Sequence, residues 1–264
     1  MKAPKSISSK KDWQKYPFRV RLAGEIVAEI VLPLRQTGKI AIIASGLPSS
    51  PSKGELLHFL ANQGYVAVSP RYRGTWESGG IFLKRSPTQD ITDTIDTLAS
   101  GRQSFIDLAT GEPFSLWAKT FHLFGFSFGG PAVVLNSAHP LVSKVVAVSP
   151  VLDWTREGED EPFEKHVLFV TAGFGGAFRV EHGRDWHKLL KPDFYNPLTQ
   201  TGDIDGRKVF IIHARDDRVV PYKPVLEFMA ETNATVYLKP HGGHHLRITH
   251  RFLWNKAAAF LSRR

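Results

Sequence analysis

The chain has 264 residues, contains no cysteine and carries a formal net charge of +9. This length suits one α/β domain with a single large core, and the absence of cysteine excludes disulfides, thiol catalysis and cysteine-ligated zinc. The positive charge could attract an anionic partner, but Lys and Arg are spread along the whole chain without a nucleic-acid recognition motif, so we predict no nucleic-acid partner.

The N-terminal segment 1–16 is basic and polar. It lacks the apolar stretch of roughly 7 to 15 residues that a secretory signal needs, so we interpret it as a flexible basic arm. No apolar run approaches the roughly 20 residues of a membrane span. We therefore expect a cytoplasmic protein with no membrane span, whose remaining residues, 17–264, form a single domain.

Eight short apolar runs rich in β-branched residues predict strands. They are Phe18–Leu22, Ile26–Leu32, Ile40–Ser45, Val66–Val68, Thr120–Gly125, Val145–Val148, Val209–His213 and Thr235–Leu238. The first two runs alternate in polarity and lie close together, which predicts an antiparallel hairpin at one edge of a sheet. The later runs are almost continuously apolar, which is typical of buried parallel strands.

Helical patterns follow most of these strands. They cover Gly54–Gln63, Thr88–Leu98, Phe128–Ser137, Lys223–Thr232 and Ile248–Leu261. Strands that alternate with helices in this way predict an α/β fold, here an eight-stranded, mostly parallel sheet with helices on both faces.

One connection, residues 151–206 after the sixth strand, is too long for a simple crossover. It contains the acidic run Glu157–Glu161 and the glycine-rich segment Thr171–Phe178. A long insertion in a compact domain is usually functional, disordered or a small subdomain. We interpret this one as a cap or lid over the site.

Ser127 is the candidate nucleophile. It lies in G-F-S-F-G, between the buried strand Thr120–Gly125 and the helix that begins at Phe128. The motif alone is weak, because glycine and serine are common. At a strand-to-helix turn, however, the serine takes a strained conformation that exposes its hydroxyl, and the flanking glycines avoid clashes with the strand and helix. The helix N-terminus also directs N–H groups toward a developing oxyanion.

Serine catalysis needs a base and a carboxylate, which should follow the serine in the order acid, then histidine. Asp216 and Asp217 follow the strand Val209–His213, at the edge of the sheet where catalytic loops gather. The residues by themselves leave both aspartates open. His213 ends a buried strand and is interpreted as a structural histidine.

Three histidines, His241, His244 and His245, lie in a glycine loop after the last predicted strand. A histidine cluster can bind metal, but this one has neither cysteine nor carboxylate beside it in the sequence. Nucleophilic catalysis also accounts for the serine and the aspartates. We therefore predict no metal and no cofactor.

From about Ile40 to the C-terminus, the chain resembles α/β hydrolases close to prolyl oligopeptidase-like and acylaminoacyl-peptidase-like catalytic domains and to small single-domain esterases. G-F-S-F-G-G resembles the nucleophile turn of that family, and H-A-R-D-D-R-V-V-P resembles its acid loop, which implies Asp217 as the triad acid. P-H-G-G-H-H-L is similar to its P-G-x-G-H loop, which implies His244, with His245 as the alternative.

The stretch S-G-L-P-S-S resembles the family's oxyanion segment H-G-F-P-S-S. The resemblance implies that the N–H groups of Leu47 and Phe128 bind the oxyanion. Ser45 replaces the usual histidine of this segment, and Ala214 replaces the usual glycine of the acid loop. The segment Ser69–Gly80 resembles a structural loop of the family beside the site.

The chain is therefore predicted to be a serine hydrolase that cleaves a carboxylic ester through an acyl-enzyme, with a peptidase using the same triad as the alternative. A non-catalytic binding protein with this fold is a third hypothesis. The partner is expected to be a small ester or a short peptide, and the oligomeric state stays open. Five aromatic residues could line an acyl pocket or belong to the ordinary core: Trp76, Phe126, Phe128, Phe174 and Trp186.

Overall fold

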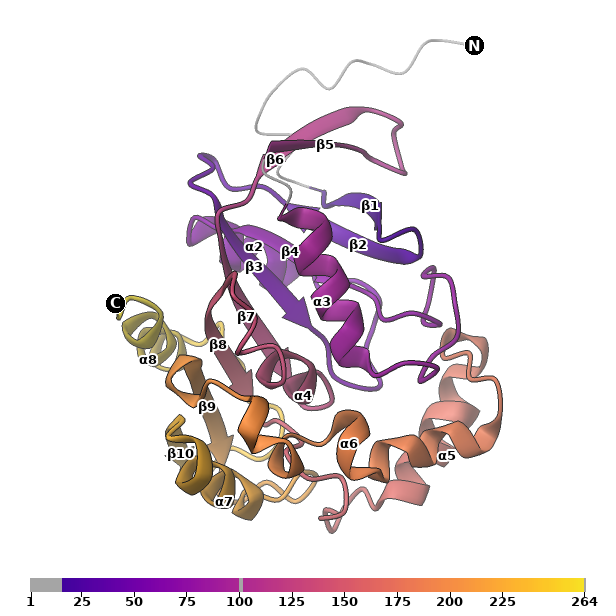
Figure 1. Cartoon of the computed structure of the whole chain (residues 1–264), viewed down its shortest axis with the longest axis vertical. Helices are drawn as coiled ribbons and strands as arrows, with labels where there is room; N and C mark the ends of the chain where they lie inside the picture. Colours follow the sequence, from indigo (N-terminus) through magenta and orange to yellow (C-terminus); the bar gives the residue numbers. More distant parts are fainter. Residues whose placement is uncertain (1–15, 100–101, 264) are drawn as a thin grey trace.

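The computed structural model describes residues 16–99 and 102–263 and is built around an eight-stranded sheet (Figure 1). The strand order across the sheet is β1-β2-β4-β3-β7-β8-β9-β10. The strands are β1 (Phe18–Leu22), β2 (Ile26–Val31), β3 (Lys39–Ala44), β4 (Val66–Pro70), β7 (Thr120–Phe126), β8 (Val142–Val148), β9 (Val209–Ala214) and β10 (Thr235–Lys239). All eight predicted strands are present, with ends that differ by a few residues.

The pairing of the strands follows their apolar patterns. β1 pairs antiparallel with β2, and β2 pairs antiparallel with β4. From β4 to β10, every neighbouring pair is parallel, and β9 is buried along its whole length. The structure therefore confirms the edge hairpin and the mostly parallel sheet.

Helices cover both faces of the sheet, and their apolar sides form two separate clusters. One cluster contains residues of α2 (Gly54–Asn62) and α8 (Arg251–Leu261). The other contains residues of α3 (Pro87–Leu98), α4 (Gly129–Val134) and α7 (Lys223–Thr232). In Figure 1, α3 and α4 lie in front of the sheet while α2 and α8 lie behind it. Among the described residues, no helix has the length and apolar character to cross a bilayer.

All five predicted helices are present, with ends that differ by up to three residues, and α4 ends at Val134 rather than at Ser137. Phe128 has helical dihedral angles but stands as the residue before α4, and α8 begins at Arg251 rather than at Ile248. His250, just before α8, has an extended ψ of 127°, so the apolar Ile248 packs against the core from a loop. The predicted arm lies outside the described residues except for Tyr16.

A second, two-stranded sheet was missed by the sequence prediction. It is the antiparallel hairpin of β5 (Arg102–Ile106) and β6 (Pro113–Trp117). β6 alternates between exposed and buried positions, and the ring of Phe114 stacks on Phe18 of β1 with centroids 4.1 Å apart. Two short, half-exposed strands give a weak pattern, and their packing partner is distant in the sequence.

The long connection after β8 forms a run of short helices beyond the carboxyl ends of the parallel strands (Figure 1). It contains α5 (Phe163–Phe174), α6 (Pro192–Tyr195) and the 3-10 turns η1 (Gly175–Ala177), η2 (Gly183–Leu190), η3 (Pro197–Thr199) and η4 (Thr201–Asp203), and a last turn η5 (Gly206–Lys208) leads into β9. Trp186 and Tyr195 of this connection are fully buried and belong to the core cluster that also contains residues of α3, α4 and α7.

Candidate active site

The turn between β7 and α4 holds Ser127 in a left-handed conformation, with φ of +49°. That conformation is strained for a residue with a side chain, and such strain is typical of functional turns. A Cβ on Gly125 would lie 2.3 Å from Cγ2 of Val133, and a Cβ on Gly129 would lie 2.1 Å from the carbonyl oxygen of Ala44. The two glycines therefore let the strand, the turn and the helix approach closely enough to present the serine.

A continuous hydrogen-bond relay joins Ser127 to two loops at the same edge of the sheet. Nε2 of His244 lies 2.9 Å from Oγ of Ser127, and Nδ1 of His244 lies 2.8 Å from Oδ2 of Asp217. Because a carboxylate only accepts, Nδ1 carries the proton and Nε2 presents a lone pair to the serine hydroxyl. This arrangement is competent to remove a proton from Ser127.

Asp217 is held as a carboxylate on both of its oxygens. Oδ1 accepts hydrogen bonds from the backbone N–H groups of Val219 at 3.0 Å and Val220 at 2.9 Å. Burial by itself would raise the pKa of Asp217, but hydrogen bonds from His213 and His244 outweigh it and hold that pKa below its usual range. The charge that orients His244 is therefore present at neutral pH.

The other acid and the other histidine that the sequence left open lie elsewhere. Asp216 accepts hydrogen bonds from the backbone N–H groups of Gly242 and Gly243, each at 2.9 Å, and so ties the acid loop to the histidine loop. These bonds lower the pKa of Asp216. His245 is exposed, and its ring contacts that of His244 with centroids 5.4 Å apart. The relay thus runs through Asp217 and His244.

Leu47 and Phe128 border the same cavity as Ser127. Within the described residues, neither backbone N–H makes a hydrogen bond. Beside these groups, the Tyr72 hydroxyl donates to the carbonyl of Ser45 at 3.1 Å, which fixes the peptide chain before Leu47. The two N–H groups are therefore available to a developing oxyanion.

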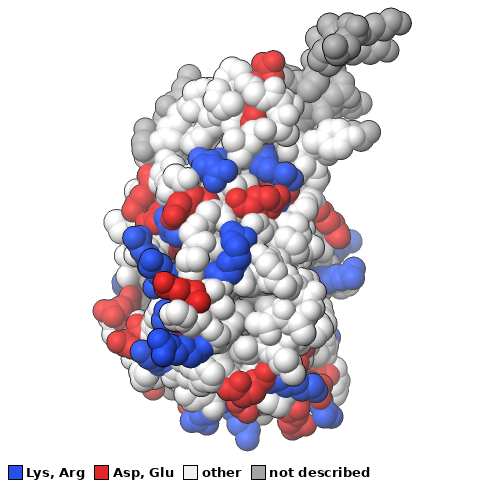
Figure 2. All heavy atoms as spheres, turned by 90° about the vertical axis from the view of Figure 1, so that its right-hand side faces the viewer, with Lys and Arg blue, Asp and Glu red and all other residues white. Residues whose placement is uncertain are grey.

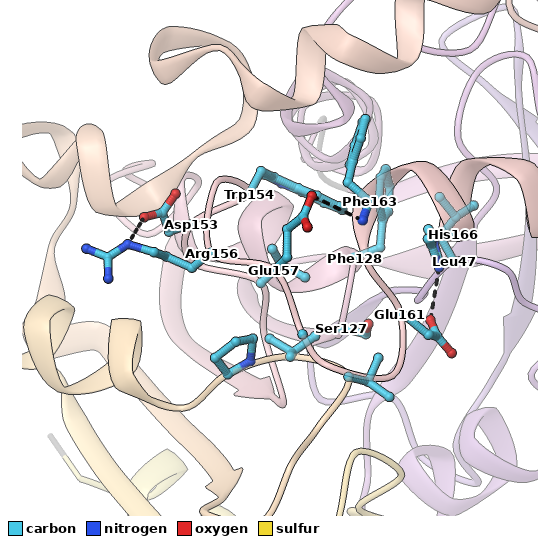
Figure 3. A pocket seen from close by; sticks show the side chains of 15 residues that line it. Leu47, Ser127, Phe128, Asp153, Trp154, Arg156, Glu157, Glu161, Phe163 and His166 are labelled. Atoms are coloured by element: carbon cyan, nitrogen blue, oxygen red, sulfur yellow. Dashed lines mark hydrogen bonds and ion pairs between the residues drawn. The ribbon is translucent and has the colours of Figure 1, made fainter.

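A cavity of about 60 Å³ opens beside Ser127 (Figure 3). Its apolar wall includes Phe128, Trp154 and Phe163. The long insertion contributes most of the remaining lining, including charged side chains. The lining residues are Leu47, Ser127, Phe128, Val151, Asp153, Trp154, Arg156, Glu157, Gly158, Glu161, Phe163, His166, Val219, Val220 and Pro221.

Of the five aromatic residues predicted for an acyl pocket, Phe128 lines this cavity and the other four do not. Trp186 is 1% exposed and packs on another core ring, and Phe174 packs on Phe169 and Phe178 of the insertion. Trp76 and Phe126 border other, separate hollows of the surface.

Trp154 and Phe163 were not singled out from the sequence, although both lie in the insertion. The position of Trp154 in the sequence could have predicted its place in the site. It lies a few residues after β8, and the carboxyl end of β8 adjoins that of β7. A chain that leaves a neighbouring strand at this edge has to pass close to the nucleophile.

Among the described residues, no group of three or more His, Asp or Glu side chains is arranged to hold a metal ion. His241 of the histidine loop extends into solvent, with 88% of its side chain exposed. The absence of a metal and of a cofactor stays a prediction.

The sequence model of the X-Pro dipeptidyl-peptidase family (S15) matches residues 4–190, which is more than half of the chain. The chain belongs to this S15 family. With the α/β-hydrolase fold described above, this family identity makes the protein a serine hydrolase and confirms the predicted class of enzyme. No curated protein matches the chain.

Solved structures share the fold of this S15 family member at low sequence identity. The Pyrococcus furiosus esterase Pf2001 superposes with a TM-score of 0.67 at 18% identity, covering 99% of this chain and 96% of that one. The α/β hydrolase GrgF from Penicillium sp. sh18 gives 0.66 at 16% identity, covering 93% and 96%. The Pyrococcus horikoshii acylaminoacyl peptidase gives 0.59 at 15%, covering 93% of this chain and 40% of that one.

Proposed function

We propose that the protein hydrolyses carboxylic esters of small acyl groups through an acyl-enzyme formed on Ser127. The observation that carries this proposal is the unbroken relay from Asp217 through His244 to the serine hydroxyl, with distances of 2.8 Å and 2.9 Å. A serine hydroxyl is a poor nucleophile unless a neighbouring base takes its proton, and this relay supplies the base and its orienting acid.

The first half of the reaction transfers the acyl group to the serine. His244 takes the proton of Ser127 as Oγ bonds to the ester carbonyl carbon, and the N–H groups of Leu47 and Phe128 stabilise the oxyanion. When the intermediate collapses, the bond to the alcohol oxygen breaks and His244 donates its proton to that oxygen. Water then attacks the acyl-enzyme by the same route and releases the acid.

The cavity supports a small acyl group as the preferred substrate portion. Its volume is about 60 Å³, and its wall presents the rings of Phe128, Trp154 and Phe163. Apolar walls of this kind favour an alkyl group over a charged one by burial of apolar surface.

Because the insertion 151–206 supplies most of this lining, we propose that it acts as the cap of the acyl site. Its position beyond the carboxyl ends of the parallel strands in Figure 1 supports this assignment.

A peptidase is the second candidate, and the acidic residues of the cavity favour it. Glu157 and Glu161 of the insertion lie among the lining residues around Ser127 (Figure 3). Carboxylates near the scissile carbonyl would attract the free amino group of a short peptide. Membership of the X-Pro dipeptidyl-peptidase (S15) family points the same way.

Ser127→Ala tests the proposal directly. We expect the variant to lose turnover of a short p-nitrophenyl ester by at least about a thousandfold, and to lose labelling by a fluorophosphonate, because both need the serine oxygen. A variant that retains either property contradicts the assignment. If the folded wild-type chain itself fails to react with the probe, the non-catalytic binding protein becomes the favoured hypothesis.

Matched substrates separate the esterase from the peptidase. Wild-type kcat/KM is measured on p-nitrophenyl esters of short acids, on aminoacyl anilides and on X-Pro anilides of similar size. The proposal predicts higher values for the esters. Higher values for anilides with a free amino group would favour the peptidase instead. In that case Glu157→Gln and Glu161→Gln should reduce the preference, and N-acetylated anilides should be poor substrates.

A further inference from the structure

A second histidine, His213 at the end of β9, contacts the same carboxylate as His244. Its Nε2 lies 3.2 Å from Oδ2 of Asp217 and 3.0 Å from the carbonyl oxygen of Val220, and its side chain is fully buried. We propose that His213 is a positioning residue that holds the Asp217 carboxylate in line with His244. This inference rests on the proposed function, because it concerns the efficiency of the same relay.

The contacts of His213 fix where its proton lies. A carbonyl oxygen can only accept a hydrogen bond, so Nε2 carries the hydrogen that it donates to Val220, and Oδ2 of Asp217 lies 3.2 Å from the same nitrogen. Nδ1 is buried and has no partner among the described residues. A proton on Nδ1 would be buried without an acceptor, which is costly. The contacts therefore place a hydrogen on Nε2, directed at the Val220 carbonyl and the Asp217 carboxylate.

Each oxygen of Asp217 is consequently held from two sides. Oδ1 receives the N–H groups of Val219 and Val220, and Oδ2 receives His213 and His244. Rotation of the carboxylate would break hydrogen bonds on both oxygens at once. The bond from His213 also withdraws charge from Oδ2, which limits how strongly Asp217 stabilises a protonated His244.

The other charged groups of the acid loop have partners other than Oδ2. Asp216 accepts hydrogen bonds from backbone N–H groups of the histidine loop. Arg218 pairs with Asp160 at 3.0 Å, and Arg215 lies over the ring of Tyr222. Among the described residues, the side chains that pair or hydrogen-bond with the Asp217 carboxylate are those of the two histidines.

Three variants test the role of His213. His213→Met removes the donor at similar volume, and His213→Gln keeps an amide donor within reach of the same oxygens. His122→Met is the matched control, because His122 is another buried strand histidine, hydrogen-bonded to Tyr65 and outside the site. The measurements are kcat and KM per fluorophosphonate-titrated site, the pH profile of kcat/KM, and the thermal midpoint.

We expect His213→Met to lower kcat roughly tenfold with little change in KM, because one charge-assisted hydrogen bond is lost. The acid limb of its pH profile should move to higher pH, since Oδ2 loses a hydrogen-bond donor and carries more negative charge. His213→Gln should restore most of the rate. His122→Met should change the thermal midpoint alone.

Results of the opposite kind overturn the inference. If His213→Met lowers the thermal midpoint while kcat per titrated site and the pH profile stay at wild-type values, His213 is structural only. If that variant does not fold, His213→Asn replaces it, because the shorter amide cannot reach both acceptors. Equal kcat values for His213→Asn and His213→Gln would then refute the positioning role. A wild-type chain that fails to react with the fluorophosphonate refutes the proposed function instead.

Discussion

At the scale of single residues, burial acts on titratable groups in opposite ways according to their partners. Asp217 keeps its charge inside the protein because each oxygen accepts hydrogen bonds. His122 of β7 is 6% exposed and has one partner, the hydroxyl of Tyr65, 2.8 Å from Nδ1. Burial, helped by the charges of Lys39 and Lys144, lowers the pKa of His122 to about 4. The first group is therefore held charged and the second neutral.

His122 should make stability depend on pH in the mildly acidic range. Its pKa is about 4 in the folded state and about 6.5 in the unfolded state, so the unfolded state binds more protons between these values. The free energy of unfolding is then complete above about pH 6.5 and falls as the pH approaches 4, by up to about 3 kcal/mol. Urea unfolding of the wild type and His122→Met at about pH 7 and about pH 5 measures this contribution.

The two proteins should differ in slope. His122→Met is expected to lose less stability than the wild type between the two pH values, because the buried titrating group is gone. Equal losses in both proteins would show that His122 does not drive the pH dependence.

At the scale of elements, the insertion is anchored in the core beneath the nucleophile. Tyr195 of α6 is fully buried, and its hydroxyl donates to the carbonyl oxygen of Phe128 at 2.7 Å. Its ring also packs on that of Phe128, with centroids 5.1 Å apart. The segment that lines the cavity is thus tied to the residue that follows Ser127, so the position of the insertion and the shape of the turn depend on each other.

Tyr195→Phe should separate this hydrogen bond from the packing of the ring. The variant leaves the Phe128 carbonyl without its buried donor, which should lower the free energy of unfolding by about 1 to 2 kcal/mol. We also expect slower fluorophosphonate labelling, because the turn that carries Ser127 is held less firmly. Urea unfolding and the labelling rate are the measurements.

Tyr237→Phe on β10 is the matched control, because the Tyr237 hydroxyl makes no hydrogen bond within the described residues and its ring is partly exposed. It should leave stability within about 0.5 kcal/mol of the wild type. If both substitutions have the same small effect, the Tyr195 hydroxyl does not anchor the insertion.

At the scale of the whole molecule, ion pairs connect elements that are distant in the sequence. On the face shown in Figure 2, Lys and Arg lie among Asp and Glu. Arg73 illustrates the pattern, because it pairs with Glu25 in the β1–β2 turn at 2.7 Å and with Asp90 and Asp93 of α3 at 2.5 Å and 2.6 Å. One guanidinium thus connects the antiparallel edge of the sheet to a helix of the covering layer.

Arg73→Met should be strongly destabilising, because it leaves the buried carboxylate of Asp90 unpaired. Burial already raises the pKa of Asp90 to about 6, against the hydrogen bonds from Arg73. We expect a loss of about 3 to 5 kcal/mol near neutral pH. Without Arg73 the folded pKa rises further, so the folded state binds more protons, and the loss should be smaller at about pH 5 than at about pH 8.

Thermal or urea unfolding of Arg73→Met at the two pH values measures both effects. Arg207→Met is the control, since Arg207 pairs with Asp205 from a side chain that is 86% exposed. That substitution should leave stability close to the wild-type value, because an exposed ion pair is screened by solvent. Similar losses for the two variants would contradict a special role for the Arg73 cluster.

The sequence alone was sufficient to predict the sheet, the helices that follow most of its strands and the candidate nucleophile. These features depend on interactions close together in the chain. A continuous apolar run such as Val209–His213 predicts a buried strand wherever it lies. A serine between glycines at the end of such a run predicts a sharp strand-to-helix turn from local sterics, and Ser127 has the corresponding positive φ.

Tertiary structure decided what depends on groups distant in the sequence. Asp216 and Asp217 are neighbours, yet one turns to the histidine loop and the other to His244 and His213, because the loops after β9 and β10 meet only in the folded sheet. The cavity wall and the β5–β6 hairpin likewise depend on contacts between residues that are distant in the sequence. Local patterns determine which strands form, whereas contacts between loops from different strands determine which side chains meet.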